Sequence, residues 1–214
     1  MPNEKFGSPS VPRKIITKSI PSSLFSLTLR QNVTFVLFRT VWRIFIEFYG
    51  LLRFSEVSNL TFSNITWTGL GIDIFISKSK TDQTRKGDWV AIASQPGSPE
   101  CPVSFTRKYL SMLPYDSGYF MPSLKSSVPD PTTPLKYLTA LRDLRSVLRL
   151  IDVDPQGYGE HSGRCGGTTA AANKGATLTE LMIQGRWQSE LMPRLYTDNA
   201  VKCKRKFARR LAHL

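Results

Sequence analysis

Apolar side chains recur at helical spacing over residues 27–49, which predicts one long helix that ends near Gly50. The most apolar run, residues 33–52, is interrupted by three charged residues, namely Arg39, Arg43 and Glu47. The run therefore predicts a buried helix of a globular protein and not a membrane span. A second, shorter helix is expected to begin near Ser55.

The hydrophobic period then changes to that of strands. Residues 64–67, 71–77 and 88–93 are rich in β-formers and are separated by glycine or charged turns. They predict a small antiparallel sheet. The segment SKSKTDQTRKGD joins the last two strands and places several cations on one hairpin.

Helices are predicted again over residues 102–112 and 135–150, the second amphipathic and basic. Residues 114–134, rich in Pro and Ser, are expected to form the longest irregular connection. Thr177 and Glu180 form a capping box, which predicts a helix that ends at Gly185 as its C-cap. We interpret residues 1–25 as a tail or linker and residues 26–214 as one mainly helical α+β domain.

The chain is strongly basic. Its 214 residues hold 29 Lys and Arg against 16 Asp and Glu, a formal net charge of +13. An excess of this size in one domain favours a polyanionic partner, and nucleic acid is the first candidate. A merely solubilising charge is the alternative. Anionic lipid fits less well, because no basic stretch has a clean apolar face.

Cysteine usage indicates a reducing compartment. Cys101, Cys165 and Cys203 are scattered and show no metal-ligand spacing, so neither a disulfide framework nor a zinc site is predicted. No secretory signal is recognisable. We expect an intracellular protein without a membrane partner, nuclear in a eukaryotic host and otherwise cytoplasmic.

Residues 161–196 hold the densest candidate chemistry. His161 and Arg164 are three residues apart, so they share one face near the start of a helix, where an anion is favoured. Trp187 and Tyr196 follow. Each of these residues alone has an ordinary structural explanation, such as a core anchor or a half-buried aromatic.

Four motifs together resemble the catalytic domain of the tyrosine recombinases, or phage integrases. LLRFSEVSNL resembles the first-arginine motif, SKSKT the hairpin-lysine motif, HSGR the family's HxxR, and GRW its third motif. Tyr196 follows Trp187 by nine residues, the usual interval. The order and spacing make the signal specific, and it covers about residues 25–214. The sequence around HSGR is most similar to the recombinases of DIRS-type and related eukaryotic mobile elements.

The resemblance implies site-specific DNA breakage and rejoining, with double-stranded DNA as the partner and no metal or nucleotide cofactor. Tyr196 would attack a phosphate and form a 3′-phosphotyrosine. Arg53 and Arg164 would clamp the phosphate oxygens. Lys80 would protonate the leaving 5′-oxygen, with Lys78 as a close rival.

For His161 and Trp187 two roles remain open, and for Glu56 the expected role is indirect. His161 would be either a phosphate donor or the proton acceptor for Tyr196, and Trp187 would donate its indole N–H or pack against the pocket. Glu56 would orient a neighbouring catalytic residue. The alternative function is a catalytically impaired DNA-binding protein of the same fold. A relaxing topoisomerase of the same chemistry is a weaker reading.

The chain departs from the family pattern at several positions. Gly163 replaces a large apolar residue inside HxxR, and Gly166 and Gly167 weaken a helix by roughly 1 kcal/mol each. Pro193 is expected to bend the helix that presents Tyr196. The helical domain that usually precedes this one is expected to be absent or not included. The family also implies a homotetramer on DNA. Its protomers would exchange their C-terminal helices, which corresponds here to the basic segment 201–214.

Overall fold

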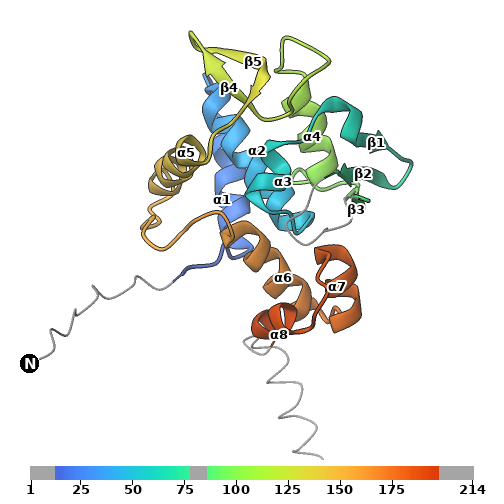
Figure 1. Ribbon diagram of the computed structural model, residues 1–214. Coiled ribbons are helices and arrows are strands. Elements are labelled where there is room, and N and C mark those ends of the chain that lie inside the picture. Colours follow the sequence, from blue (N-terminus) through green and yellow to red (C-terminus); the bar gives the residue numbers. More distant parts are fainter. Residues whose placement is uncertain (1–12, 78–85, 198–214) are drawn as a thin grey trace, which may run out of the picture.

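The computed structural model describes residues 13–77 and 86–197 (Figure 1). Helices dominate and two small antiparallel sheets accompany them, so the predicted α+β class is confirmed. The central helix α2 (Phe35–Tyr49) packs against helices α1, α4, α5 and α6. Helices α6, α7 and α8 gather at one end of the molecule in Figure 1. Among the described residues, none of the helices combines the length and apolarity that crossing a membrane requires.

The predicted helix over residues 27–49 begins only at Phe35, because residues 28–34 form a turn that follows an earlier helix. Helix α1 (Ser19–Leu27) ends before a turn in which Asn32 has a φ of 59°. Thr34 then begins α2, because its side chain accepts a hydrogen bond of 3.2 Å from the Leu37 N–H. Apolar periodicity runs through both helices, so it did not reveal the break. The predicted end at Gly50 is confirmed.

The interpretation of residues 1–25 as a tail is wrong for the described part. Ile16 is 1% exposed, and Leu24 in α1 is fully buried. Pro21 lies in the first turn of α1, where its missing N–H costs nothing, so a proline-containing segment still forms a core helix.

The segment before α1 is hydrogen-bonded to the start of helix α6 (Ser162–Lys174) and to the turn before it. Lys14 N–H donates to the Gly157 carbonyl at 2.9 Å, and Ile16 N–H donates to the Ser162 carbonyl at 3.0 Å. The Ser162 hydroxyl donates back to the Lys14 carbonyl at 2.8 Å. This strip of backbone therefore lies along the turn that leads into α6.

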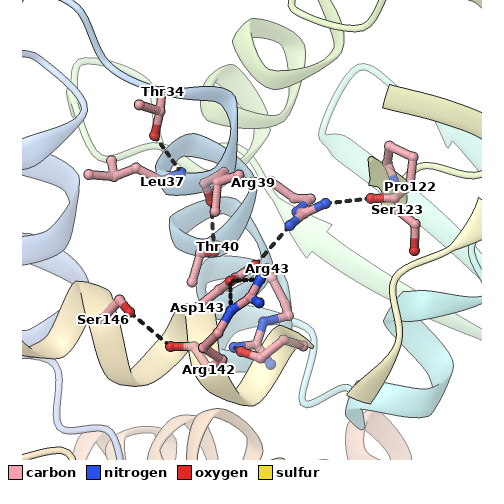
Figure 2. A network of polar contacts seen from close by, with 12 residues as sticks. Thr34, Leu37, Arg39, Thr40, Arg43, Pro122, Ser123, Arg142, Asp143 and Ser146 are labelled. Atoms are coloured by element: carbon pink, nitrogen blue, oxygen red, sulfur yellow. Dashed lines mark hydrogen bonds and ion pairs between the residues drawn. The ribbon is translucent and has the colours of Figure 1, made fainter. Parts of the chain in front are cut away.

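Three charged residues of α2 are buried on one face, as the sequence predicted for a buried helix. Arg39 forms an ion pair of 2.8 Å with Asp143 of helix α5 (Tyr137–Arg149) and donates to the Pro122 carbonyl (Figure 2). Arg43 pairs with Glu47 at 3.3 Å. These contacts satisfy charges that would otherwise be costly in the core.

The predicted sheet is confirmed. Strands β1 (Ile65–Trp67), β2 (Gly71–Ile76) and β3 (Asp88–Ala93) form an antiparallel sheet in that order. Ile74 lies opposite Val90, and both are buried in the core. The short helices α3 (Phe54–Ser58) and η1 (Phe62–Asn64) precede the sheet.

The expected irregular connection over residues 114–134 instead contains a hairpin. Strands β4 (Pro122–Lys125) and β5 (Val128–Pro134) pair across Ser126 and Ser127, which both have positive φ. A two-stranded sheet has only edge strands, so prolines that lack an N–H donor are tolerated there. Helices α4 (Pro102–Leu110) and α5 lie where helices were predicted.

The last three helices carry the candidate chemistry. The Thr177–Glu180 capping box is confirmed at the start of α7 (Leu178–Gly185). Gly185 is not the C-cap, because Arg186 takes the left-handed conformation with a φ of 54°. In α8 (Leu191–Thr197), Pro193 lies in the first turn and does not interrupt the helix.

Glycines in α6 allow unusually close packing. A Cβ at Gly166 would lie 1.8 Å from the Ile16 carbonyl oxygen, and one at Gly167 would lie 2.0 Å from that of Phe48. Helix α6 thus rests almost backbone to backbone on its neighbours. The two glycines serve this packing, which the sequence-based view of them as weak helix positions did not foresee.

Candidate active site around Glu56

Arg53 and Glu56 form the first part of the site, at the start of α3. Leu51 has a φ of 49°, which makes a tight turn between α2 and α3. The Glu56 carboxylate accepts the Arg53 backbone N–H at 2.8 Å and the Arg53 guanidinium at 2.7 Å. The Arg53 side chain remains 13% exposed. It is therefore oriented by Glu56 and still accessible at its edge.

Arg164 reaches the same carboxylate from α6. Its Nη1 lies 3.9 Å from Glu56 Oε2 and donates to the Leu51 carbonyl at 2.8 Å. Its Nη2 donates to the Gly185 carbonyl. The side chain is 4% exposed. Backbone carbonyls from two distant segments thus fix the plane of this guanidinium beside Arg53.

Arg186 is a third arginine in this group, and the sequence analysis did not single it out. Its Nη2 donates to Glu56 Oε2 at 2.6 Å, and its side chain is 4% exposed. The only available signal was its place inside GRW, which gave no reason to choose it over its neighbours. We refer to Glu56 with Arg53, Arg164 and Arg186 as the Glu56 cluster.

The Glu56 cluster carries an excess of positive charge. Burial alone would raise the pKa of the Glu56 carboxyl, but Arg186, Arg53 and Arg164 together hold that pKa below its ordinary value. The carboxylate is therefore ionised at neutral pH and still faces three guanidinium groups. Such a group of cations favours a bound anion, and a planar guanidinium suits phosphate oxygens.

His161 lies at the edge of this group, as the N-cap of α6. Its side chain is 47% exposed, and its Nε2 lies 3.3 Å from Glu160 Oε1. Partial burial lowers the pKa of the imidazole below its ordinary value. Arg164 and Arg53 lower this pKa further, whereas Glu160 opposes them. His161 is therefore neutral at pH 7 and able to accept a proton.

Trp187 packs on the cluster from the end of α7. Its ring centroid lies 4.3 Å from the Arg164 guanidinium carbon, a cation–π contact. Gly185 makes room for it, because a Cβ there would meet the indole ring at 2.0 Å. The ring therefore packs against Arg164, and the role of the indole N–H as a phosphate donor stays a prediction.

The remaining candidates are placed only in part. Tyr196 belongs to α8, which packs against α6 and α7, so its backbone lies on a helix adjacent to the one that carries Arg164. Its side chain is outside the described part of the structure. Lys78 and Lys80 also lie outside the described residues, between β2 and β3. Asp88, at the start of β3, acts electrostatically on Arg186, so the base of this connection lies near the cluster.

This fold is that of the catalytic domain of the tyrosine recombinases. The chain is similar to an integrase/recombinase XerD homolog of Selenomonas ruminantium, with 27% identity over 155 residues. The match covers 72% of this chain and 46% of that relative, slightly less than half of its length. No protein-family model matches the chain.

Solved structures show the same fold. XerA recombinase has a TM-score of 0.68 and 15% identity, and the match covers 96% of this chain and 65% of that one. The Tn1549 transposon integrase in complex with transposon right end DNA also has a TM-score of 0.68 and 15% identity, covering 98% of this chain and 68% of that one. The resemblance to DIRS-type recombinases stays a prediction.

Proposed function

We propose that this chain breaks and rejoins DNA through a covalent 3′-phosphotyrosine. The observation that supports this most is the meeting of Arg53 and Arg164, which are 111 residues apart in sequence, on the single carboxylate of Glu56. Two guanidinium groups in one place can bind the non-bridging oxygens of one phosphodiester. They also stabilise the charge that develops there during displacement.

In this reaction the Tyr196 oxygen attacks the phosphorus, and the bond to the 5′-oxygen breaks. His161, neutral at pH 7, takes the phenol proton, while Lys80 or its rival Lys78 gives a proton to the leaving 5′-oxygen. Rejoining reverses both transfers. Bond energy is kept in the phosphotyrosine, so neither metal nor nucleotide is required.

Duplex DNA as the partner is supported by the surface of α5. Arg142, Arg145 and Arg149 are exposed and follow one another at three- and four-residue spacing, so they form a single stripe. The one acidic residue of α5, Asp143, is buried and pairs with Arg39 at 2.8 Å and with Arg142 at 3.2 Å. Helix α5 begins near the site, because Tyr137 in its first turn packs on Phe54, next to Arg53, with 5.6 Å between ring centroids.

We also propose assembly as a homotetramer on DNA through residues 201–214. A pocket of about 670 Å³ between α2, α6 and α7 supports this, with Phe48, Leu51, Ala170 and Leu181 among its lining residues. Apolar residues of the C-terminal segment recur at helical spacing and suit such a pocket. Phe207→Ser should therefore weaken tetramers on DNA in analytical ultracentrifugation while monomers stay folded. The expected location is the nucleus of a eukaryotic host, or otherwise the cytoplasm.

A pool of nicked suicide duplexes with randomised sequence tests the reaction. The wild-type chain should accumulate a protein–DNA adduct that survives denaturation, and peptide mapping should place the DNA on Tyr196. Tyr196→Phe is the matched control, because it removes only the attacking oxygen. It should bind the same duplexes and form no adduct.

Two outcomes would change the proposal. Binding without any wild-type adduct would favour the catalytically impaired DNA-binding protein. An adduct that persists in Tyr196→Phe would show that another residue is the nucleophile.

A further inference from the structure

Helix α6 also approaches α2 closely at Gly163, one of the two residues between His161 and Arg164. An ideal Cβ at Gly163 would lie 2.8 Å from Glu47 Cβ and 2.8 Å from Glu47 Oε2. The Glu47 side chain therefore lies against the backbone of the first turn of α6. A larger residue at position 163 would push that turn away from α2.

Glu47 is a buried carboxylate that the proposed reaction does not use. It is 2% exposed and pairs with Arg43 at 3.3 Å. Arg43 in turn donates to the Ala140 carbonyl of α5 at 3.3 Å and lies over the Phe54 ring of α3. The charged groups that act on Glu47 are Arg43, on its own helix, and Glu160, just before α6.

The ionised form of Glu47 is disfavoured in the folded chain. Burial raises the pKa of its carboxyl to about 7, Arg43 lowers it, and Glu160 raises it. Neutral residues of similar volume can replace buried ion pairs without loss of stability. Burying the Glu47 carboxylate is unfavourable, and it lies beside the turn that bears His161 and Arg164. This placement indicates a role for Glu47 at that turn.

We propose that Glu47 is a positioning residue that sets how deeply the first turn of α6 rests on α2. The turn carries His161 and Arg164, and Arg164 is held by the Leu51 carbonyl only four residues after Glu47. The dipole at the start of a helix favours a nearby carboxylate, so it steadies this turn locally although burial disfavours the ionised form overall. This proposal rests on the proposed function, because the reaction is what requires that placement.

The first test is hydrogen exchange of the full chain, which needs no DNA. At pH 8, Glu47→Gln should speed amide exchange in residues 161–168 by about fivefold, the size of a well-placed charge at a helix end. At pH 6 the wild type should resemble the variant, because Glu47 is then protonated. Asp143→Asn is the matched control: it removes a buried carboxylate of α5 that pairs with Arg39, eight residues before Glu47 on α2. It should leave exchange in residues 161–168 unchanged.

The second test is single-turnover adduct formation with saturating nicked duplex. Wild-type rates should rise as the pH passes about 7, the value to which burial raises the Glu47 pKa. Glu47→Gln should lose this rise and react more slowly, with duplex affinity unchanged. Should Glu47→Gln fail to fold, the paired replacement Arg43→Met with Glu47→Gln leaves no buried charge unpaired.

The outcomes separate the two proposals. Changed exchange in residues 161–168 without any wild-type adduct would overturn the proposed function and leave the structural role of Glu47 in place. An adduct whose rate and pH profile are the same in Glu47→Gln, with unchanged exchange, would overturn the positioning role. Equal effects of Glu47→Gln and Asp143→Asn on both readouts would also overturn it.

Discussion

Glu47 and Glu56 are buried to nearly the same extent, at 2% and 4% exposed, but their surroundings have opposite electrostatic effects. Burial pushes the pKa of both carboxyls upward. Glu47 has one guanidinium, Arg43, at 3.3 Å, and its pKa stays raised, at about 7. Glu56 has two guanidinium groups within 2.7 Å and a third at 3.9 Å, and its pKa is lowered.

The number of guanidinium groups per carboxylate distinguishes a structural pair from a candidate site. The Arg43–Glu47 pair is balanced in charge. The Glu56 cluster keeps surplus positive charge at low exposure, where the dielectric is low and a phosphate would be held strongly. Burial and residue type alone would not have separated these two regions.

The largest effect is expected from Glu56→Gln. It leaves three guanidinium groups without their shared carboxylate, so the free energy of unfolding at pH 7 should fall by about 3–5 kcal/mol. Urea denaturation measures this loss. Glu190→Gln is the control, because it breaks an exposed pair with Arg194 and should change stability by less than about 1 kcal/mol. Similar small losses in both variants would contradict the importance of the cluster.

Arg53→Lys should act on the reaction more than on the fold. Lysine keeps the charge but loses the paired donors, so the rate of adduct formation should fall by about 10²–10³-fold. Gel analysis of adduct against time measures it, with circular dichroism to check folding. Arg30→Lys, in the exposed turn before α2, is the matched control and should react at close to the wild-type rate. A near-normal rate for Arg53→Lys would remove Arg53 from the site.

Stability should depend on pH in opposite directions for the two glutamates. Because the folded-state pKa of Glu47 is raised from 4.5 to about 7, its contribution should fall by about 3 kcal/mol as the pH rises across that window. Glu47→Gln should abolish this fall in urea denaturation series. The pKa of Glu56 is lowered, so its contribution is present above its ordinary pKa and is lost as the pH falls through its folded value. If the free energy of unfolding of Glu47→Gln followed the same pH dependence as that of the wild type, the opposite behaviour proposed for the two glutamates would be contradicted.

The smallest effect is expected from Thr177→Ala, which removes the N-cap of α7. The loss should be about 1 kcal/mol, and α7 should hold Arg186 against Glu56 less firmly. Thr34→Ala removes the equivalent cap of α2, which carries none of the cluster. Both variants should lose similar stability, but only Thr177→Ala should also slow adduct formation. Equal rates would show that α7 does not position the cluster.

Local signals in the sequence predicted local structure well. The capping box at Thr177, the strand pattern over residues 71–77 and the end of α2 at Gly50 each depend on a few neighbouring residues. The break at Thr34 and the hairpin at Ser126 were missed, because continuous periodicity and proline content masked them. The fold itself was predicted by motif order, not by periodicity.

The site was predictable only where the motifs pointed to it. Arg53, Glu56, Arg164 and Trp187 were named in advance, and the structure places them together. Arg186 was missed, since nothing local shows that a left-handed helix end will turn its side chain toward Glu56. Glu47 was read only as a buried charge, because its approach to Gly163 depends on how α2 and α6 pack.

The strip of backbone that joins Lys14 and Ile16 to Gly157 and Ser162 has a mechanical consequence. A pulling force applied to the chain ahead of Lys14 reaches the turn that bears His161 before it reaches α1. Tension at the amino-terminal side would therefore tilt the start of α6 first, while the aromatic interior around α2 still resists.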